Sequence, residues 1–338
     1  MAFSDYSFAP MEGITVYTFR QVFNKYYGGV DRYYTPFINP NTGKALDKKA
    51  VREILPENNK GIKLIPQILT NDSRLFLEAA KEIREYGYDT VNLNLGCPSK
   101  TVSSKGRGSG FLRKREDLDR FFKDIFEKTD MKISVKTRIG YASEDEFTEL
   151  LDIYAKYPID ELIIHPRLQS DYYSGNVRYD AFRTAAERYR GLRGKESIPE
   201  NGPGVTACGT DTRLCFNGDI CDVNDAARVS GMFPDVKSVM IGRGFLKNPE
   251  LMQDIAGKST SDKKRLRQFA DEMLEEYRHE LDDDRLSLFK MKEIWTYLAE
   301  RFDSSDKQKK AIMKSSRLSE YNDAVTLIFM QCELKEKE

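Results

Sequence analysis

The chain has 338 residues, enough for about two domains or for a barrel of about 250 residues with a smaller partner. Hydrophobic residues make up 40% and charged residues 32%, a globular balance that excludes a disordered or fibrous protein. The 54 basic residues equal the 54 acidic residues, which excludes a uniformly basic nucleic-acid coat but leaves room for a local basic face.

The sequence predicts neither export nor membrane insertion. No stretch reaches about 18 apolar residues, and the first residues lack a basic segment followed by an apolar run. The five cysteines are odd in number and sparse, which indicates reduced thiols and a cytoplasmic location. Cys208, Cys215 and Cys221 are spaced too widely for paired zinc ligands, so we expect no metal site.

Short β-rich apolar runs alternate with helical patterns along most of the chain. Nearly continuous apolar runs are typical of parallel strands that are covered on both faces. Between them, 71–86 and 116–128 each place their apolar residues on one helical face, and Ser143 with Glu146 predicts a capping box. We expect strands at 7–11, 32–36, 63–69, 90–95, 132–137, 161–165, 213–217 and 238–241.

This alternation predicts parallel strands joined by right-handed crossovers. Eight units within 1–257 favour a (β/α)8 TIM barrel, and an open doubly wound sheet is the alternative. The segment 190–212 contains Gly and Pro and predicts an exposed insertion.

The strand pattern stops near residue 258. The helices expected beyond it make 258–338 a C-terminal all-α helical domain, joined to the barrel domain 1–257 by a linker at 259–262. We expect these helices at 264–281, 286–302, 307–316 and 319–333.

In such a barrel, residues that follow the strands converge on one catalytic face. After the fourth strand comes Cys97, whose thiol has an ordinary pKa of about 8.5 and so keeps a proton to give to a carbanion at neutral pH. An isolated cysteine is more often a small buried apolar residue, but Gly96 and Pro98 place this one in a tight turn.

Two cationic or titratable residues end the next strands. Lys136 lies in an apolar strand, so it either reaches water at the rim or faces an anionic cofactor. His165 ends the sixth strand, where an ordinary core histidine is an equal alternative. His279, the other histidine of the chain, lies within a helix and is expected to be structural.

The last two strands end in 217–219, Asn-Gly-Asp, and 242–244, Gly-Arg-Gly. TIM barrels often bind a phosphate in these two loops, where glycines let the backbone approach the oxygens and an arginine adds a charged fork. The expected phosphate ligands are Asn217, Gly218, Asp219, Gly242 and Arg243. Pro10, Met11 and Gln67 complete the ring of strand ends.

Together these motifs resemble those of the tRNA-dihydrouridine synthases, and the resemblance runs through the barrel and the helical domain. The most specific motif is Asn-Leu-Gly-Cys-Pro at 94–98, whereas the others are shared with wider flavin-binding barrels. The motifs are 9–13, 94–100, 135–138, 165–167, 217–219 and 242–244.

The resemblance implies bound FMN, NAD(P)H as a transient reductant, and tRNA as the partner. Separately, we expect the chain to be monomeric. Reduced FMN would give a hydride to C6 of a uridine, and Cys97 would protonate C5. Lys136 would stabilise negative charge on the reduced flavin. The family usually has Gly where this chain has Pro166, which stiffens the backbone there. Pro10, Met11 and Gln67 would line the isoalloxazine, Asn94 would lie near flavin or uracil, and His165 would contact either one.

Two runs of basic charge favour a nucleic-acid partner. The segment 98–115 has six basic residues and no acid, and 285–317 has nine basic residues against four acids. Either run alone is more often a solvated face. Trp295, Tyr297 and Phe302 are expected in helix core, and the Gly-rich 106–110 is expected to be a mobile loop. The expected substrate-binding residues are Arg138, Arg167, Lys100, Lys105 and Arg107.

Two other functions remain open on the sequence alone. One is an FMN barrel that acts on a small molecule, as dihydroorotate dehydrogenases or ene-reductases do. The other is an RNA-binding protein with a vestigial barrel. The basic helical tail argues against the first, and bound flavin would exclude the second.

Overall fold

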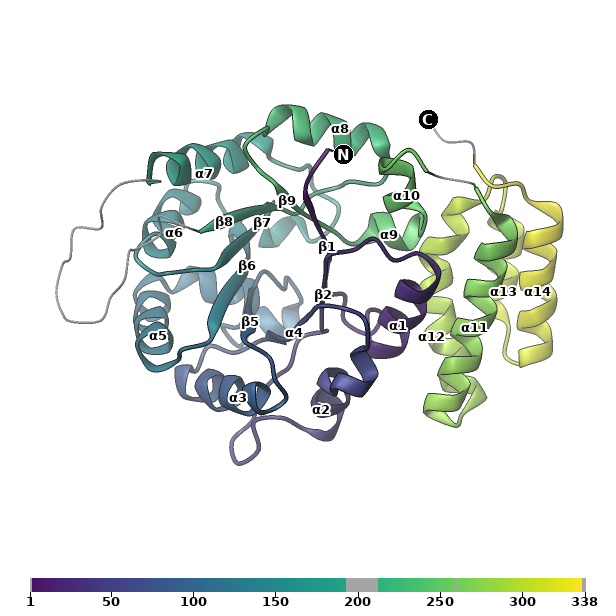
Figure 1. The fold of residues 1–338 in the computed structure, drawn as a ribbon, viewed down its shortest axis with the longest axis horizontal. Coiled ribbons are helices and arrows are strands. Elements are labelled where there is room, and N and C mark those ends of the chain that lie inside the picture. The colour runs from purple at the N-terminus through teal and green to yellow at the C-terminus, as the bar shows by residue number, and fades with distance from the viewer. Residues whose placement is uncertain (1, 193–211, 259–260, 336–338) are drawn as a thin grey trace.

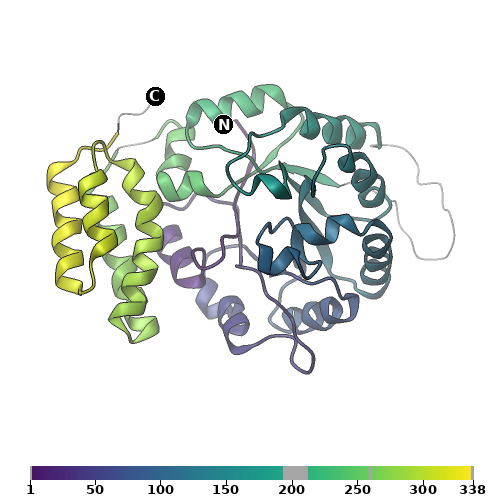
Figure 2. The ribbon, with the colours of Figure 1, turned by 180° about the vertical axis from the view of Figure 1, so that it is seen from behind.

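A computed structural model describes residues 2–192, 212–258 and 261–335. Within them, helices surround a parallel sheet, and a bundle of helices lies beside it (Figures 1 and 2). The strands are β1 (Asp5–Phe8), β2 (Arg32–Tyr34), β3 (Leu64–Ile65), β4 (Gln67–Ile68), β5 (Thr90–Leu95), β6 (Lys132–Gly140), β7 (Glu161–Leu168), β8 (Arg213–Phe216) and β9 (Ser238–Ile241). The helices around them are α1 (Tyr17–Tyr26), α2 (Lys48–Ile54), α3 (Ser73–Glu85), α4 (Lys100–Ser103), α5 (Arg115–Lys128), α6 (Glu146–Tyr154), α7 (Tyr179–Leu192), α8 (Val223–Met232), α9 (Arg243–Lys247) and α10 (Leu251–Ile255).

The sheet closes on itself at Pro66. Its order is β3-β2-β1-β9-β8-β7-β6-β5-β4, and the strands at its two ends, β3 and β4, are separated only by this proline. β3 pairs with β2 and β4 pairs with β5, while the Pro66 carbonyl accepts from Asn92 N at 2.8 Å. Proline has no N–H to donate, so it suits the point where one strand changes neighbours. The predicted TIM barrel is thereby confirmed, and the open sheet is wrong.

Several predicted boundaries shift. β1 ends at Phe8 rather than at residue 11, whereas β6 and β7 run on to Gly140 and Leu168, past the predicted ends at 137 and 165. Arg138, His165 and Arg167 therefore lie inside strands. The cause is a ladder that these two strands continue beyond the barrel, with a register shift between Arg138 and Gly140.

The predicted capping box at Ser143 is half correct. The Glu146 carboxylate accepts from Ser143 N at 2.9 Å, as a capping box requires. However, α6 begins at Glu146 with Asp145 as its N-cap, and the Ser143 hydroxyl accepts from Asp145 N.

The C-terminal bundle packs against one side of the barrel through α1. Phe269 packs against rings of α1 and of the residue that caps it, with centroids 6.4 Å from Phe19, 6.4 Å from Phe23 and 5.2 Å from Tyr27. The division of the chain into domains 1–257 and 258–338 stays a prediction. The bundle consists of α11 (Lys263–Leu281), α12 (Asp284–Leu298), α13 (Asp306–Lys314) and α14 (Leu318–Gln331), close to the predicted ranges.

Parts of the predicted insertion and linker lie outside the described residues. α7 continues to Leu192, beyond the predicted start of the insertion at 190, and 193–211 are not described. Residues 259–260 of the predicted linker are not described either. None of the helices in the described ranges is both long and apolar enough to span a bilayer.

Candidate active site

A cavity of about 400 Å³ opens at the carboxyl ends of the barrel strands. A volume of this size suits a small-molecule or cofactor site. Every residue predicted as catalytic or cofactor-binding lines it, and so does Arg138. These residues are Pro10, Met11, Gln67, Asn94, Cys97, Lys136, His165, Asn217, Gly218, Asp219, Gly242 and Arg243.

A relay of side-chain amides leads to the cavity lining at Gln67 and Asn94. Asn92 donates to Ser134 Oγ at 2.9 Å and accepts from Gln67 Nε2 at 2.7 Å. The Gln67 carbonyl then accepts from Asn94 Nδ2 at 2.8 Å, and Asn94 Oδ1 accepts from Cys97 N at 2.9 Å. Because each amide uses both its donor and its acceptor, the relay fixes how Gln67 and Asn94 face the cavity and holds the turn that carries Cys97.

The Cys97 turn rests on the following Gly-rich segment. The Cys97 carbonyl accepts from Ser109 N at 3.1 Å and from Ser109 Oγ at 2.8 Å. Gly108 has φ +55°, and a Cβ there would meet the Cys97 carbonyl oxygen at 2.9 Å. The expectation of a mobile loop at 106–110 is therefore wrong, because the buried residues 108–112 form a 3-10 helix under the cysteine.

The electrostatics of the cavity keep Cys97 protonated and weaken the proton affinity of Lys136. Burial raises the pKa of the half-buried Cys97 thiol. Burial and then the charge of Arg138 lower the pKa of Lys136 to about 8. A protonated thiol can act as an acid, and a lysine with a lowered pKa gains stability from an anionic ligand.

Arg138 reaches the cavity, but its donors hold backbone. Its Nε, Nη1 and Nη2 atoms donate to the carbonyls of Gly96 at 2.9 Å, Leu168 at 2.7 Å and Tyr172 at 2.6 Å. With its side chain fully buried, the arginine ties the Cys97 turn to the segment after β7. Its predicted contact with substrate stays a prediction.

Arg167 lies behind the cavity wall and pairs with Asp219. Arg167 Nη2 contacts Asp219 Oδ2 at 2.5 Å, while Arg243 Nη2 contacts Asp219 Oδ1 at 2.6 Å. Arg167 Nη1 also lies 3.1 Å from His165 Nε2. Pro166 stands where the β6–β7 register shifts, a place that tolerates a residue without an N–H. The Arg167 side chain is only 3% exposed, which leaves little of it for a substrate to contact. Binding of substrate by Arg167 stays a prediction.

The basic segment 98–115 does not act as one surface. Lys100 and Lys105 are exposed outside the cavity lining, and Arg107 donates to Asn39 Oδ1 at 2.6 Å. Arg115 pairs with Glu146 at 3.0 Å. Part of the predicted positive charge is thus neutralised by ion pairing, and contact of Lys100, Lys105 and Arg107 with substrate stays a prediction.

The helical bundle supplies a wall residue that the sequence analysis placed in the core. Trp295 and Phe302 are buried as expected, but Tyr297 of α12 is half-buried and lines the cavity. It shares a helix face with Lys290, whose Nζ donates to the Gly13 carbonyl at 2.7 Å. The seven-residue spacing between Lys290 and Tyr297 indicates a shared helix face, but the sequence does not show that this face docks against the barrel. Other lining residues that were not predicted as site residues are Ala9, Glu12, Ile14, Phe37, Gly96, Tyr173, Ile220, Cys221 and Gly244.

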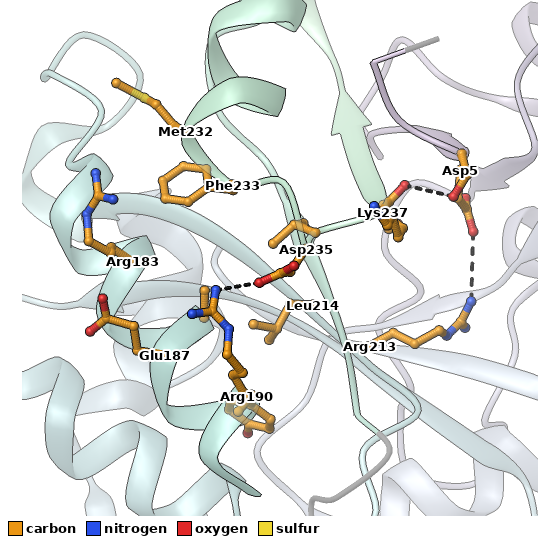
Figure 3. A pocket seen from close by; sticks show the side chains of 15 residues that line it. Asp5, Arg183, Glu187, Arg190, Arg213, Leu214, Met232, Phe233, Asp235 and Lys237 are labelled. Carbon is orange, nitrogen blue, oxygen red and sulfur yellow. Dashed lines mark hydrogen bonds and ion pairs between the residues drawn. The ribbon is translucent and has the colours of Figure 1, made fainter. Parts of the chain in front are cut away.

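A second cavity of about 500 Å³ lies at the other end of the barrel (Figure 3). Four of its charged side chains form two pairs, with Arg190 2.6 Å from Asp235 and Arg213 3.8 Å from Asp5. The amino ends of barrel strands are a stability face, whereas catalysis takes place at the carboxyl ends. Although it is larger, this cavity is therefore the weaker candidate.

A closed parallel barrel with polar residues converging at its carboxyl end defines an enzyme of the TIM-barrel class. Morphinone reductase shares this fold, with a TM-score of 0.51 at 11% identity, over 77% of this chain and 88% of that one.

Sequence comparisons then place the chain within the class. tRNA-dihydrouridine synthase B of Vibrio vulnificus is 26% identical over 248 residues, which cover 73% of this chain and 69% of that protein. Probable tRNA-dihydrouridine synthase 2 of Bacillus subtilis is 30% identical over 242 residues, which cover 71% of this chain and 69% of the relative. The family model described as dihydrouridine synthase matches residues 7–331. The chain belongs to the dihydrouridine synthase family and is an enzyme of that family.

Proposed function

We propose that the chain is an FMN-dependent oxidoreductase that reduces the C5–C6 double bond of uridines in tRNA to 5,6-dihydrouridine, with NAD(P)H as the electron donor. The family match and the names of the relatives support tRNA uridine as the substrate. One observation carries the proposal: the protonated thiol of Cys97 shares a cavity with cationic and amide side chains.

The residues present fit FMN. Arg243 gives the cavity positive charge that suits an anionic flavin phosphate, Lys136 offers a cation to the flavin ring, and Gln67 and Asn94 offer amide groups in fixed orientations. At Gly242 a Cβ would meet Ala9 Cβ at 3.2 Å and Met11 Sδ at 3.6 Å, so a side chain there would crowd the cavity lining. Lys136 would hold the flavin ring, and the 217–219 and 242–243 segments would hold its phosphate.

The chain's own residues position the base and deliver the proton. The target uridine must leave its stack to enter a cavity at the end of the barrel. Bound FMN, once reduced by NAD(P)H, would supply the hydride that adds to C6. Cys97 then protonates C5: its S–H bond breaks, a C–H bond forms, and the thiolate regains a proton from solvent. The relay ending at Asn94 keeps Cys97 in place throughout.

The test replaces the thiol. Cys97→Ala should lose dihydrouridine formation by about 10²-fold or more, because a positioned acid contributes about that much. It should keep its flavin absorbance and its oxidation of NAD(P)H by oxygen. Dihydrouridine is measured in tRNA from a deletion strain after incubation with each variant.

Cys221→Ala is the matched variant, because Cys221 is the other half-buried thiol of the cavity lining. It should retain most of the activity. Unchanged tRNA modification by Cys97→Ala, or loss in the Cys221 variant instead, would show that the acid is assigned to the wrong group.

A further inference from the structure

All three nitrogens of the Arg167 guanidinium contact acceptors. Its Nε donates to the Gly175 carbonyl at 2.5 Å, and its two terminal nitrogens contact the two oxygens of Asp219 at 3.1 and 2.5 Å. A bidentate pair of this kind fixes the plane of the guanidinium as well as its position. The remaining contact of Nη1 is His165 Nε2, at 3.1 Å.

This contact determines which ring nitrogen of His165 carries the proton. A guanidinium has only donors, so the nitrogen that it meets must be an acceptor. His165 Nε2 therefore carries no hydrogen, and a neutral ring must then be protonated on Nδ1. The imidazolium form is excluded by the same contact, because it would set two N–H groups against each other.

We propose that Arg167, anchored by Asp219, is a positioning residue that fixes His165 as a neutral imidazole protonated on Nδ1. His165 lines the cavity, so it offers its ligand an N–H donor rather than an acceptor or a second cation. That this donor serves flavin or uracil rests on the proposed function. The state of the ring follows from the contacts of Arg167 alone.

The other groups around His165 act in the same direction. The pKa of His165 is held well below its usual value, chiefly by burial. Four cations lower it further: Arg138 and Lys136 on β6, Arg167 on β7 and Arg243 on α9. The carboxylate beyond them, Asp219, is shared between Arg167 and Arg243. Those two arginines lower the pKa of Asp219 although burial opposes the shift, so the anchor stays ionised.

The chain has only two histidines, which makes the tautomer directly measurable. In protein labelled with ¹⁵N-histidine, the His279→Gln variant assigns the two rings, because His279 is exposed on α11. We expect His165 to show a protonated Nδ1 and an unprotonated Nε2, with no change between about pH 5 and 8. A ring protonated on Nε2, or a ring that titrates normally, would overturn the proposal. This spectrum needs no variant in the site.

Arg167→Met then tests the cause. Without the guanidinium, Nε2 is free to take a proton, so the ring should exchange between tautomers and its pKa should rise by about one unit or more. Arg178→Met is the matched control, since it removes a nearby cation that pairs with Asp171 and Glu144. It should leave the His165 signals unchanged. Unchanged signals in Arg167→Met would show that Arg167 does not set the tautomer.

These spectra separate the two proposals. If the purified chain held no flavin and formed no dihydrouridine, the proposed function would fail, yet the His165 tautomer would still be readable. If the chain modified tRNA while His165 was protonated on Nε2, only the assignment of Arg167 would fall.

Discussion

The two ends of the barrel handle buried charge in opposite ways. At the amino end, Arg32 forms a bidentate ion pair with Glu161, at 2.9 and 2.8 Å, and also contacts Asp5 at 2.8 Å. Tyr34 and Ser238 give Glu161 two more hydrogen bonds, at 3.2 and 2.9 Å. Arg32, Glu161 and Asp5 thus each have a counter-charge within hydrogen-bond distance, and this network stabilises the fold without a ligand.

At the carboxyl end, three cations and two carboxylates, Glu12 and Asp219, line a cavity. Lys136, Arg138 and Arg243 line it, and the carboxylate of Asp219 is already shared by two arginines. The lowered pKa of Lys136 shows that the folded chain disfavours this cation in the absence of an anion. The contrast teaches that charge serves stability at one end and ligand binding at the other.

The largest expected change comes from breaking the amino-end network. Glu161→Ala leaves Arg32 buried without its main partner, which should lower the free energy of unfolding by about 3–5 kcal/mol. Chemical denaturation of the parent and the variant measures the difference. FMN affinity of the folded variant should stay near that of the parent. A loss of FMN binding with unchanged stability would reverse the roles assigned to the two ends.

Removing Lys136 at the carboxyl end should weaken ligand binding without lowering stability. Lys136→Met should weaken FMN binding by about tenfold or more. A tenfold change corresponds to about 1.4 kcal/mol, and a hydrogen bond to a charged group contributes about that much or more. The stability of the flavin-free protein should be unchanged or higher, because a partly desolvated charge is gone. FMN titration and denaturation of flavin-free protein measure the two effects. A variant that was less stable but bound FMN normally would contradict the comparison.

Raising the pH should mimic this substitution in part. The pKa of Lys136 is about 8 in the folded chain, below the value of about 10.4 expected when it is unfolded. Between these values the unfolded chain binds more protons, so the contribution of Lys136 to stability rises with pH. FMN affinity should fall over the start of the same range as the cation is lost. The change of stability with pH and the change of FMN affinity with pH are each measured in the parent and in Lys136→Met. An equal pH dependence in the two proteins would exclude Lys136 as its source.

The smallest effect is expected in the second cavity. Arg190→Ala removes a pair with Asp235 in which both side chains are more than half exposed, so stability should change by less than about 1 kcal/mol. Activity on tRNA should match the parent. A marked loss of activity in this variant would mean that the cavity at the amino end has a role that charge pairing alone does not explain.

Much of the fold and the ring of site residues could be predicted because both depend on local patterns. Apolar runs marked the strands, and chemistry at their ends marked Cys97, Lys136 and the two glycine-containing loops. Tyr297 could not be placed, because its exposure to the cavity depends on how α12 docks against the barrel. The roles of Arg138 and Arg167 depend on which carbonyls and carboxylates the folded chain brings to them, and no sequence spacing encodes that.

The most direct test of the central claim is a titration of flavin-free protein with FMN, followed by flavin fluorescence. The account predicts saturable binding of a single FMN per chain that is weakened by Lys136→Met and kept by Cys97→Ala. A purified protein without flavin, and without saturable FMN binding when the cofactor is added, would contradict it.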